Sequence, residues 1–151
     1  MIEKFEIKAA LVEACRKKIL ETIDSLETAM SDAQQQANDY GPPKDRYDAF
    51  RSQLMRRRDM IAQQLSKEMI ELKALDRIDQ KKMVDTVEFG AIVLTPEQNY
   101  FISIGIGKIE AAGMTFFTIS PMVPISQAIA GKKKNEISEF RGTKIQILDV
   151  F

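Results

Sequence analysis

The residues that could carry chemistry are concentrated in one short stretch, and the chain has no histidine. Without imidazole there can be no Cys-His or Ser-His pair, no imidazole general base and no His-ligated metal, so an enzyme would have to use carboxylates, lysine or tyrosine. The stretch Asp39–Asp48 surrounds a Gly-Pro-Pro sequence with acids, tyrosines and basic residues: Asp39, Asp45, Asp48, Tyr40, Tyr47, Lys44 and Arg46.

This stretch lies between two long segments with helical periodicity. Gly41, Pro42 and Pro43 are the only glycine and prolines before residue 86, and apolar residues on both sides repeat at heptad spacing, which predicts two helices packed along a shared seam. Residues 1–85 are therefore predicted to form an antiparallel coiled-coil hairpin with its tip at 39–48. The predicted seam residues are Val12, Ile19, Ile23, Leu26, Met30, Ala33 and Ala37 in the first helix, and Tyr47, Leu54, Ile61, Leu65 and Leu72 in the second.

The composition changes after Asp85, which predicts a second domain at 86–151. Six of the seven glycines fall there, and frequent glycines are typical of the turns that join strands. We expect an α+β fold, in which the hairpin is followed by a small β-sheet domain with one short helix. The expected strands are Thr86–Leu94, Tyr100–Ile109, Met114–Ile119, Glu136–Phe140 and Lys144–Phe151, and the expected helix is Pro124–Ala130 with Gly131 just past its end.

The composition of the whole chain excludes several classes of protein. Lys plus Arg and Asp plus Glu both number 22, so no general field for binding polyanions is expected. The chain has a single cysteine, Cys15, no apolar run long enough to span a bilayer and no visible targeting peptide, so we expect a cytoplasmic protein without membrane contact. We also expect a monomer. Cys15 is expected to be buried packing near the seam.

Several motifs resemble the C-terminal domain of the GreA/GreB transcript cleavage factors. They are Phe89–Val93, Ile119-Ser120-Pro121, the run Pro124–Lys132 and Lys144–Leu148, and the order of the domains is also similar. The resemblance implies a C-terminal domain of FKBP-like fold that docks on RNA polymerase, with Ser120, Pro121, Pro124 and Ile125 as the docking residues. In that family Ser-Pro directly precedes the helix, whereas Met122 and Val123 intervene here.

The resemblance also implies a mechanism, in which the hairpin enters the secondary channel of the polymerase. The tip carboxylates would lie beside the catalytic Mg²⁺, and a second Mg²⁺ held there would activate water for cleavage of backtracked RNA. The chain would then have no cofactor or metal of its own and would not itself be an enzyme. Asp39, Asp45 and Asp48 are the candidate acids, Tyr47 matches a tyrosine near the family's tip, and Arg51, Arg56, Arg57 and Arg58 match a basic patch that contacts the RNA 3′ end.

The tip departs from the family pattern, which leaves three hypotheses open. The family's glutamate has no clear equivalent, and Lys44 and Arg46 reduce the negative charge. The chain could stimulate cleavage, could occupy the channel without cleavage and antagonise cleavage factors, or could be an independent enzyme such as a prolyl isomerase. In a purely structural interpretation, Asp39 ends one helix, Asp45 stabilises the first turn of the next, and the arginines form a solvated helix face.

Overall fold

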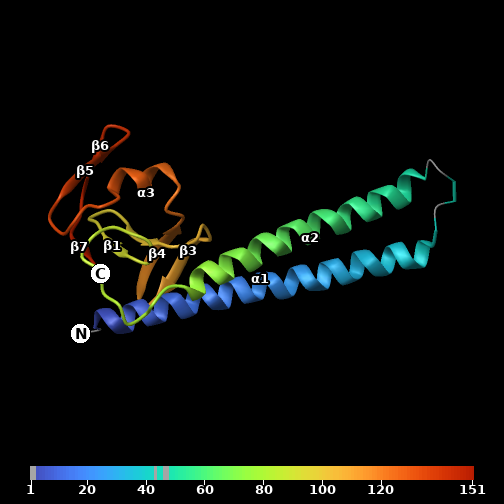
Figure 1. Ribbon diagram of the computed structural model, residues 1–151, viewed down its shortest axis with the longest axis horizontal. Helices are drawn as coiled ribbons and strands as arrows, with labels where there is room; N and C mark the ends of the chain where they lie inside the picture. Colours follow the sequence, from blue (N-terminus) through green and yellow to red (C-terminus); the bar gives the residue numbers. More distant parts are fainter. Residues whose placement is uncertain (1–2, 43, 46–47) are drawn as a thin grey trace. The chain divides into compact units, whose positions relative to one another are not determined.

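The structure is a computed structural model that describes residues 3–42, 44–45 and 48–151 (Figure 1). Two long helices, α1 (Lys4–Tyr40) and α2 (Ala49–Asp76), precede a small domain with a mixed sheet, which confirms the predicted fold class. No helix within the described ranges is long and apolar enough to cross a membrane. The elements of the small domain are β1 (Ile92–Leu94), β2 (Asn99–Ile102), β3 (Gly107–Ala111), β4 (Met114–Ile119), α3 (Pro124–Ile129), β5 (Ile137–Phe140), β6 (Thr143–Gln146) and β7 (Asp149–Val150).

The chain divides into two compact units. The first, which we call the sheet unit, combines the start of α1, up to Lys17, with the residues from Lys73 onward. The second, the hairpin unit, is Lys18–Leu72. The start of α1 and the end of α2 thus belong to the same compact unit as the small domain. The predicted boundary between two functional domains at Asp85 stays a prediction.

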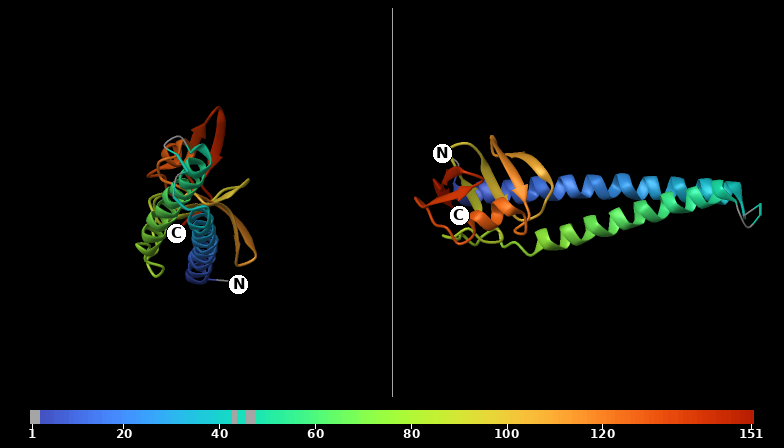
Figure 2. Two further views of the ribbon diagram at one scale, coloured as in Figure 1. Left: turned by 90° about the vertical axis from the view of Figure 1, so that its right-hand side faces the viewer. Right: turned by 90° about the horizontal axis from the view of Figure 1, so that it is seen from above.

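Within the hairpin unit, α1 and α2 run antiparallel, as both ribbon views show (Figures 1 and 2). Their seam follows the heptad pattern: Ile19, Ala33 and Ala37 are buried, and Leu54, Ile61, Leu65 and Leu72 of α2 are half-buried. A seam between only two helices is covered from one side, so its larger residues keep part of their surface in water. Tyr47, predicted for the same seam, lies outside the described residues.

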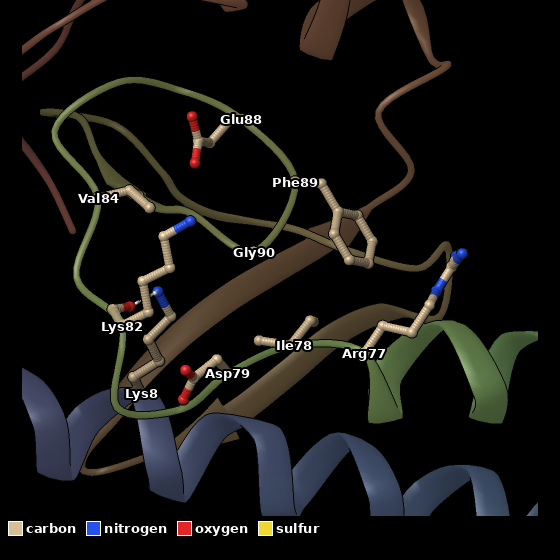
Figure 3. Close-up of a pocket in the computed structure, with 9 residues that line it drawn as sticks. All are labelled: Lys8, Arg77, Ile78, Asp79, Lys82, Val84, Glu88, Phe89 and Gly90. Atoms are coloured by element: carbon tan, nitrogen blue, oxygen red, sulfur yellow. Dashed lines mark hydrogen bonds between the residues drawn. The ribbon is translucent and has the colours of Figure 1, made fainter.

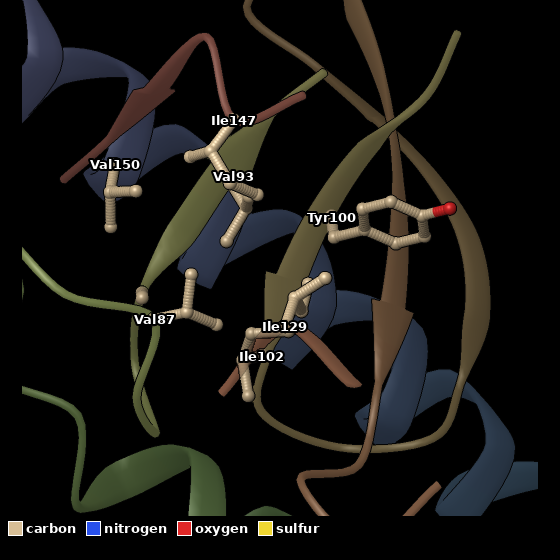
Figure 4. Close-up of a cluster of buried hydrophobic side chains, with 8 residues drawn as sticks. Val87, Val93, Tyr100, Ile102, Ile129, Ile147 and Val150 are labelled. Atoms are coloured by element: carbon tan, nitrogen blue, oxygen red, sulfur yellow. The ribbon is translucent and has the colours of Figure 1, made fainter. Parts of the chain in front are cut away.

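The sheet unit contains a five-stranded sheet with the order β3-β4-β2-β1-β7 and a separate ribbon of β5 and β6. Strands β2 and β4 pair in parallel, and the other pairs are antiparallel. On one face, Val93 lies opposite both Tyr100 and Val150, and these residues pack with Ile129 of α3 in a buried apolar cluster (Figure 4). Ile92 and Phe101, which point to the opposite face, are also fully buried, so both faces of the central strands are covered.

Four of the predicted strands are shorter or divided, one of them only because β5 begins at Ile137, one residue later than predicted. In the segment Thr86–Leu94 only Ile92–Leu94 is a strand, because Gly90 takes a left-handed φ of 91° that interrupts the extended chain. The segment Tyr100–Ile109 breaks into β2 and β3, and Gly107 at the start of β3 has a φ of 83°. The segment Lys144–Phe151 becomes β6 and β7, because the chain leaves β5 and then pairs with β1.

Helix α3 and the last hairpin are bounded by residues that suit the backbone conformations found there. Pro124 begins α3, and Gly131 beyond its end has a φ of 76°. Arg141 and Gly142 join β5 to β6 with φ values of 53° and 78°, which is the two-residue turn that suits the twist of paired strands.

The start of α1 is fixed to the rest of the sheet unit by buried and charged contacts. Leu11, Val12 and Cys15 are buried, which confirms Cys15 as a packing residue. Lys4 Nζ lies 3.0 Å from Oδ2 of Asp149, the first residue of β7, and Arg16 Nη1 lies 2.5 Å from Asp76 Oδ1 at the end of α2.

Candidate functional site

The hairpin tip is built around the end of α1. Gly41 follows the helix with a φ of 86°, a conformation that suits glycine, and its N–H donates to the carbonyl of Ala37 at 3.1 Å. Because this bond closes the last turn, the chain leaves α1 sharply at Gly41. The side chains of Tyr40, Asp48 and Arg51 then hold the connection to α2.

Asp48 is the N-cap of α2. Its Oδ1 accepts a hydrogen bond from the backbone N–H of Arg51, three residues into the helix, at 3.1 Å. Its Oδ2 accepts the N–H of Lys44 at 2.9 Å, and the hydroxyl of Tyr40 lies 2.7 Å from Oδ2 and 2.9 Å from Oδ1. Both carboxylate oxygens are therefore used to hold the loop and the first turn of α2.

These hydrogen bonds shift the pKa values of both partners. The N–H of Lys44, more than the Tyr40 hydroxyl and the Arg51 N–H, lowers the pKa of Asp48 below its usual range. The bond to Asp48 is also the main cause that raises the pKa of the Tyr40 phenol. Asp48 thus stays ionised and Tyr40 stays protonated at neutral pH.

The basic residues of the tip are used in the same loop. Lys44 Nζ donates to the carbonyl of Tyr40 at 3.1 Å and lies 4.9 Å from the centre of the Tyr40 ring. Arg51 Nε donates to the carbonyl of Gly41 at 3.0 Å, and the rings of Tyr40 and Phe50 lie 5.0 Å apart. The cations therefore offset the charge of Asp48 within the tip.

The other two predicted acids are exposed. Asp39 lies one residue before the end of α1, and its Oδ1 accepts a hydrogen bond from Gln35 Nε2 at 2.8 Å. Asp45 precedes α2, which begins at Ala49, so the expectation that Asp45 stabilises the first turn of that helix was wrong. Asp48 has that role, because it is the residue directly before α2 and its Oδ1 accepts the N–H of Arg51 in the first turn.

Sequence reasoning missed Tyr40 as an organiser of the tip. Its partner is eight residues away across a loop, and no periodic pattern relates two such positions. Tyr47, the predicted tip tyrosine, and Arg46 lie outside the described residues. No group of three or more Cys, Asp or Glu residues suited to a metal ion occurs in the part of the chain that the structure describes.

The predicted basic patch separates into two pairs. Arg51 closes the tip loop, and Arg58 is held by Gln34 of α1 at 3.0 Å and by Asp59 at 3.0 Å. Arg56 and Arg57 are exposed and line a groove of about 620 Å³ along α2. These two arginines are the members of the predicted patch that remain on the surface for a polyanion.

The predicted docking residues lie in and beside a turn that precedes α3. The Ser120 carbonyl accepts the Ser126 hydroxyl at 2.7 Å and the Val123 N–H at 3.3 Å, so the turn is tied to the helix. Pro124 is exposed, whereas Ile125 packs partly against the buried apolar cluster and so also belongs to the core. Met122, which was not among the predicted docking residues, has 75% of its surface exposed at this turn.

Comparisons with known proteins find distant likenesses in solved structures. No family model matches this sequence, and no curated protein matches it. One similar structure is described as the transcription factor Gfh1, with 12% identity, coverage of 91% of this chain and 93% of that chain, and a TM-score of 0.34. Another is the GreA factor homolog 1 (Gfh1) protein of Thermus thermophilus, with 9% identity, coverage of 90% and 94%, and a TM-score of 0.34. At these scores neither likeness carries an argument about the function of this chain.

Proposed function

We propose that this chain is a Gre-like transcription regulator that binds RNA polymerase and inserts its hairpin into the secondary channel. In this proposal the turn at Ser120–Pro124 contacts the polymerase, and the tip occupies the pore without supplying metal ligands. The chain is then a regulator and not itself an enzyme. The resemblance of Phe89–Val93 and Pro124–Lys132 to Gre factors supports the choice of partner.

The length of the hairpin supports insertion into a deep pore. Within the hairpin unit α1 runs from Lys18 to Tyr40, a stretch of 23 residues that at about 1.5 Å per residue corresponds to roughly 35 Å. Ala33 and Ala37, with 1% and 4% of their surface exposed, keep the helix seam thin near the tip. A long and narrow element of this kind buries little apolar core for its length, so we infer that its role is to extend into a narrow space.

The hydrogen bonds that Asp48 already accepts favour a role in occupying the channel over a role in RNA cleavage. A metal ion at this carboxylate would have to displace donors from Lys44, Arg51 or Tyr40, and would thereby remove the N-cap of α2. Lys44 and Arg51 add positive charge where a second Mg²⁺ would need negative charge. The polar groups of the tip thus stabilise its own fold, which suits a segment that occupies the channel better than one that donates metal ligands.

An assay on backtracked polymerase complexes tests this function. The unmodified protein is expected to bind the polymerase, to release no short 3′ RNA fragments, and to slow cleavage by a true cleavage factor in proportion to its concentration. The double variant Asp39→Asn with Asp45→Asn is expected to compete at least as well, because it brings less negative charge to an acidic catalytic centre.

Two outcomes would contradict the proposal in different ways. Fragment release by the unmodified protein that disappears in the Asn variant would assign a cleavage role to the tip acids. Failure to capture RNA polymerase from native cell extract, with the hairpin helices intact by circular dichroism, would remove the polymerase as partner.

A further inference from the structure

Lys8 is a buried lysine that has few partners for its charge. It lies on α1 within the sheet unit, and only 1% of its surface is exposed. Its ammonium group can donate three hydrogen bonds, and to the residues that the structure describes it donates one, to the carbonyl of Lys82 at 2.9 Å. Among the described residues no carboxylate forms an ion pair with it, although buried lysines are usually paired.

Lys8 borders a pocket of about 280 Å³ between α1 and the segment that follows α2 (Figure 3). Lys82 also lines this pocket, and in the close-up its side chain points toward the carboxylate of Glu88. In that view the ammonium groups of Lys8 and Lys82 lie between the carboxylates of Glu88 and Asp79. The pocket therefore presents two positive and two negative groups to one small space.

These four groups retain hydrogen-bonding capacity. Asp79 Oδ1 accepts the N–H of Lys81 at 2.9 Å, and Glu88 Oε2 accepts the hydroxyl of Thr86 at 3.1 Å, so each carboxylate has a second oxygen to offer. Within the described ranges none of the four forms an ion pair with another. Burial lowers the pKa of Lys8, and the nearby charges of Asp79 and Glu88 oppose that change.

The remaining walls of the pocket are mostly apolar. Ile78, Val84 and Phe89 line it, and the guanidinium of Arg77 lies 5.8 Å from the centre of the Phe89 ring. Figure 3 shows Arg77 beyond Phe89 and away from Lys8, so its charge belongs to the rim. A ligand with an apolar body between two polar ends would contact both kinds of wall.

We propose that this pocket binds a free α-amino acid with an apolar side chain. Its carboxylate would accept hydrogen bonds from Lys8 and Lys82, and its ammonium group would donate to Glu88 and Asp79. Its side chain would pack against Ile78, Val84 and Phe89. A zwitterion satisfies both pairs of charges at once, whereas a simple anion or cation would satisfy one pair and be repelled by the other.

The volume of the pocket limits the size of the ligand. About 280 Å³ lies just below the range of roughly 300–1,000 Å³ typical of drug-sized ligands, so a single small metabolite fits and a nucleotide does not. The proposal goes beyond polymerase binding and uses no residue of the tip or of the turn before α3. It can be tested on the isolated chain without the polymerase.

A nuclear magnetic resonance titration with three matched compounds tests the site. L-leucine carries both charges on an isobutyl body, isocaproate lacks the ammonium group, and isoamylamine lacks the carboxylate. L-leucine is expected to produce saturable shifts in amide signals at 77–90. The other two compounds are expected to bind about tenfold more weakly or worse, since each loses charge-assisted hydrogen bonds.

Variants on the pocket wall make the assignment specific. Lys82→Met and Glu88→Gln change exposed residues and leave the Lys82 carbonyl in place for Lys8, so both are expected to fold and to weaken L-leucine binding about tenfold. Lys108→Met and Glu110→Gln, on exposed positions of β3, are the matched controls and are expected to leave binding unchanged.

Three results would overturn the proposal. The first is the absence of saturable shifts with L-leucine. The second is equal binding of isocaproate, which would make the pocket a site for oxyanions alone. The third is equal loss of affinity in the β3 controls, which would show that the measured binding depends on general surface charge.

Discussion

Replacing Ile129 by alanine tests whether α3 holds the sheet unit together. Ile129 is fully buried in the apolar cluster, where it meets Val93 and Tyr100. The change deletes three carbons, worth about 2.4 kcal/mol at roughly 0.8 kcal/mol each, and a residual cavity adds about 1 kcal/mol. We therefore expect a loss of about 3 to 4 kcal/mol in the free energy of unfolding of this unit.

Hydrogen exchange followed by mass spectrometry measures this loss in each unit separately. At about 1.4 kcal/mol per tenfold change, protection of amides in β1 and β2 should fall by more than a hundredfold, while peptides from 18–72 keep their protection. Ile125→Ala on the same helix is the matched control, and because Ile125 is half-buried it should cost about half as much. Equal effects of the two variants, or an equal loss of protection in the hairpin, would refute this account of α3.

Three further predictions concern Lys8, Asp48 and the hairpin seam. Because burial lowers the pKa of Lys8 from 10.5, the unfolded chain binds more protons than the folded chain at pH values between the two pKa values, so Lys8 makes the stability of the wild type rise with pH. Measured by urea unfolding, the stability of Lys8→Met relative to wild type should therefore fall from pH 7 to pH 10. A difference that stays constant with pH would contradict the burial of a charged Lys8. Asp48→Asn should lower the pKa of Tyr40, measured by phenolate absorbance, and an unchanged tyrosine titration would show that their hydrogen bond is not formed in solution. Leu26→Asp should reduce the helicity measured by circular dichroism, because it places a charge at the seam. Leu20→Asp is the control and should keep the helicity, because 47% of the surface of Leu20 is exposed. Similar losses in both variants would show that Leu26 does not face α2.

The long helices were predictable because their pattern repeats many times. A heptad pattern sustained over several turns, with one interruption at Gly41-Pro42-Pro43, leaves few alternatives to a hairpin. The strands were harder to delimit, because each has only two to six residues and a single left-handed glycine ends the extended conformation. Gly90 and Gly107 are such positions, and their sequences alone do not distinguish a glycine within a strand from one that ends it.

The candidate site was predicted only in outline. The tip acids could be located by their position between two helices, but the capping role of Asp48 depends on where α2 begins, and helix starts are among the features least determined by local sequence. The burial of Lys8 was not predicted, because a lysine within an amphipathic helix usually lies in water. Its environment is made by residues 77–90, far away in the sequence, and no local pattern reports such a contact.

The discontinuous sheet unit has a consequence for the order of folding. The hairpin unit, Lys18–Leu72, is one continuous segment whose helices can form and meet across a short loop. The sheet unit must instead bring together segments such as Lys8 and Lys82, which are 74 positions apart. Because closing long loops slows folding, the hairpin is expected to form first in a fast kinetic phase. Its assembled helices would then shorten the effective loop that the sheet unit has to close, so the hairpin unit would act as a folding template for the sheet unit.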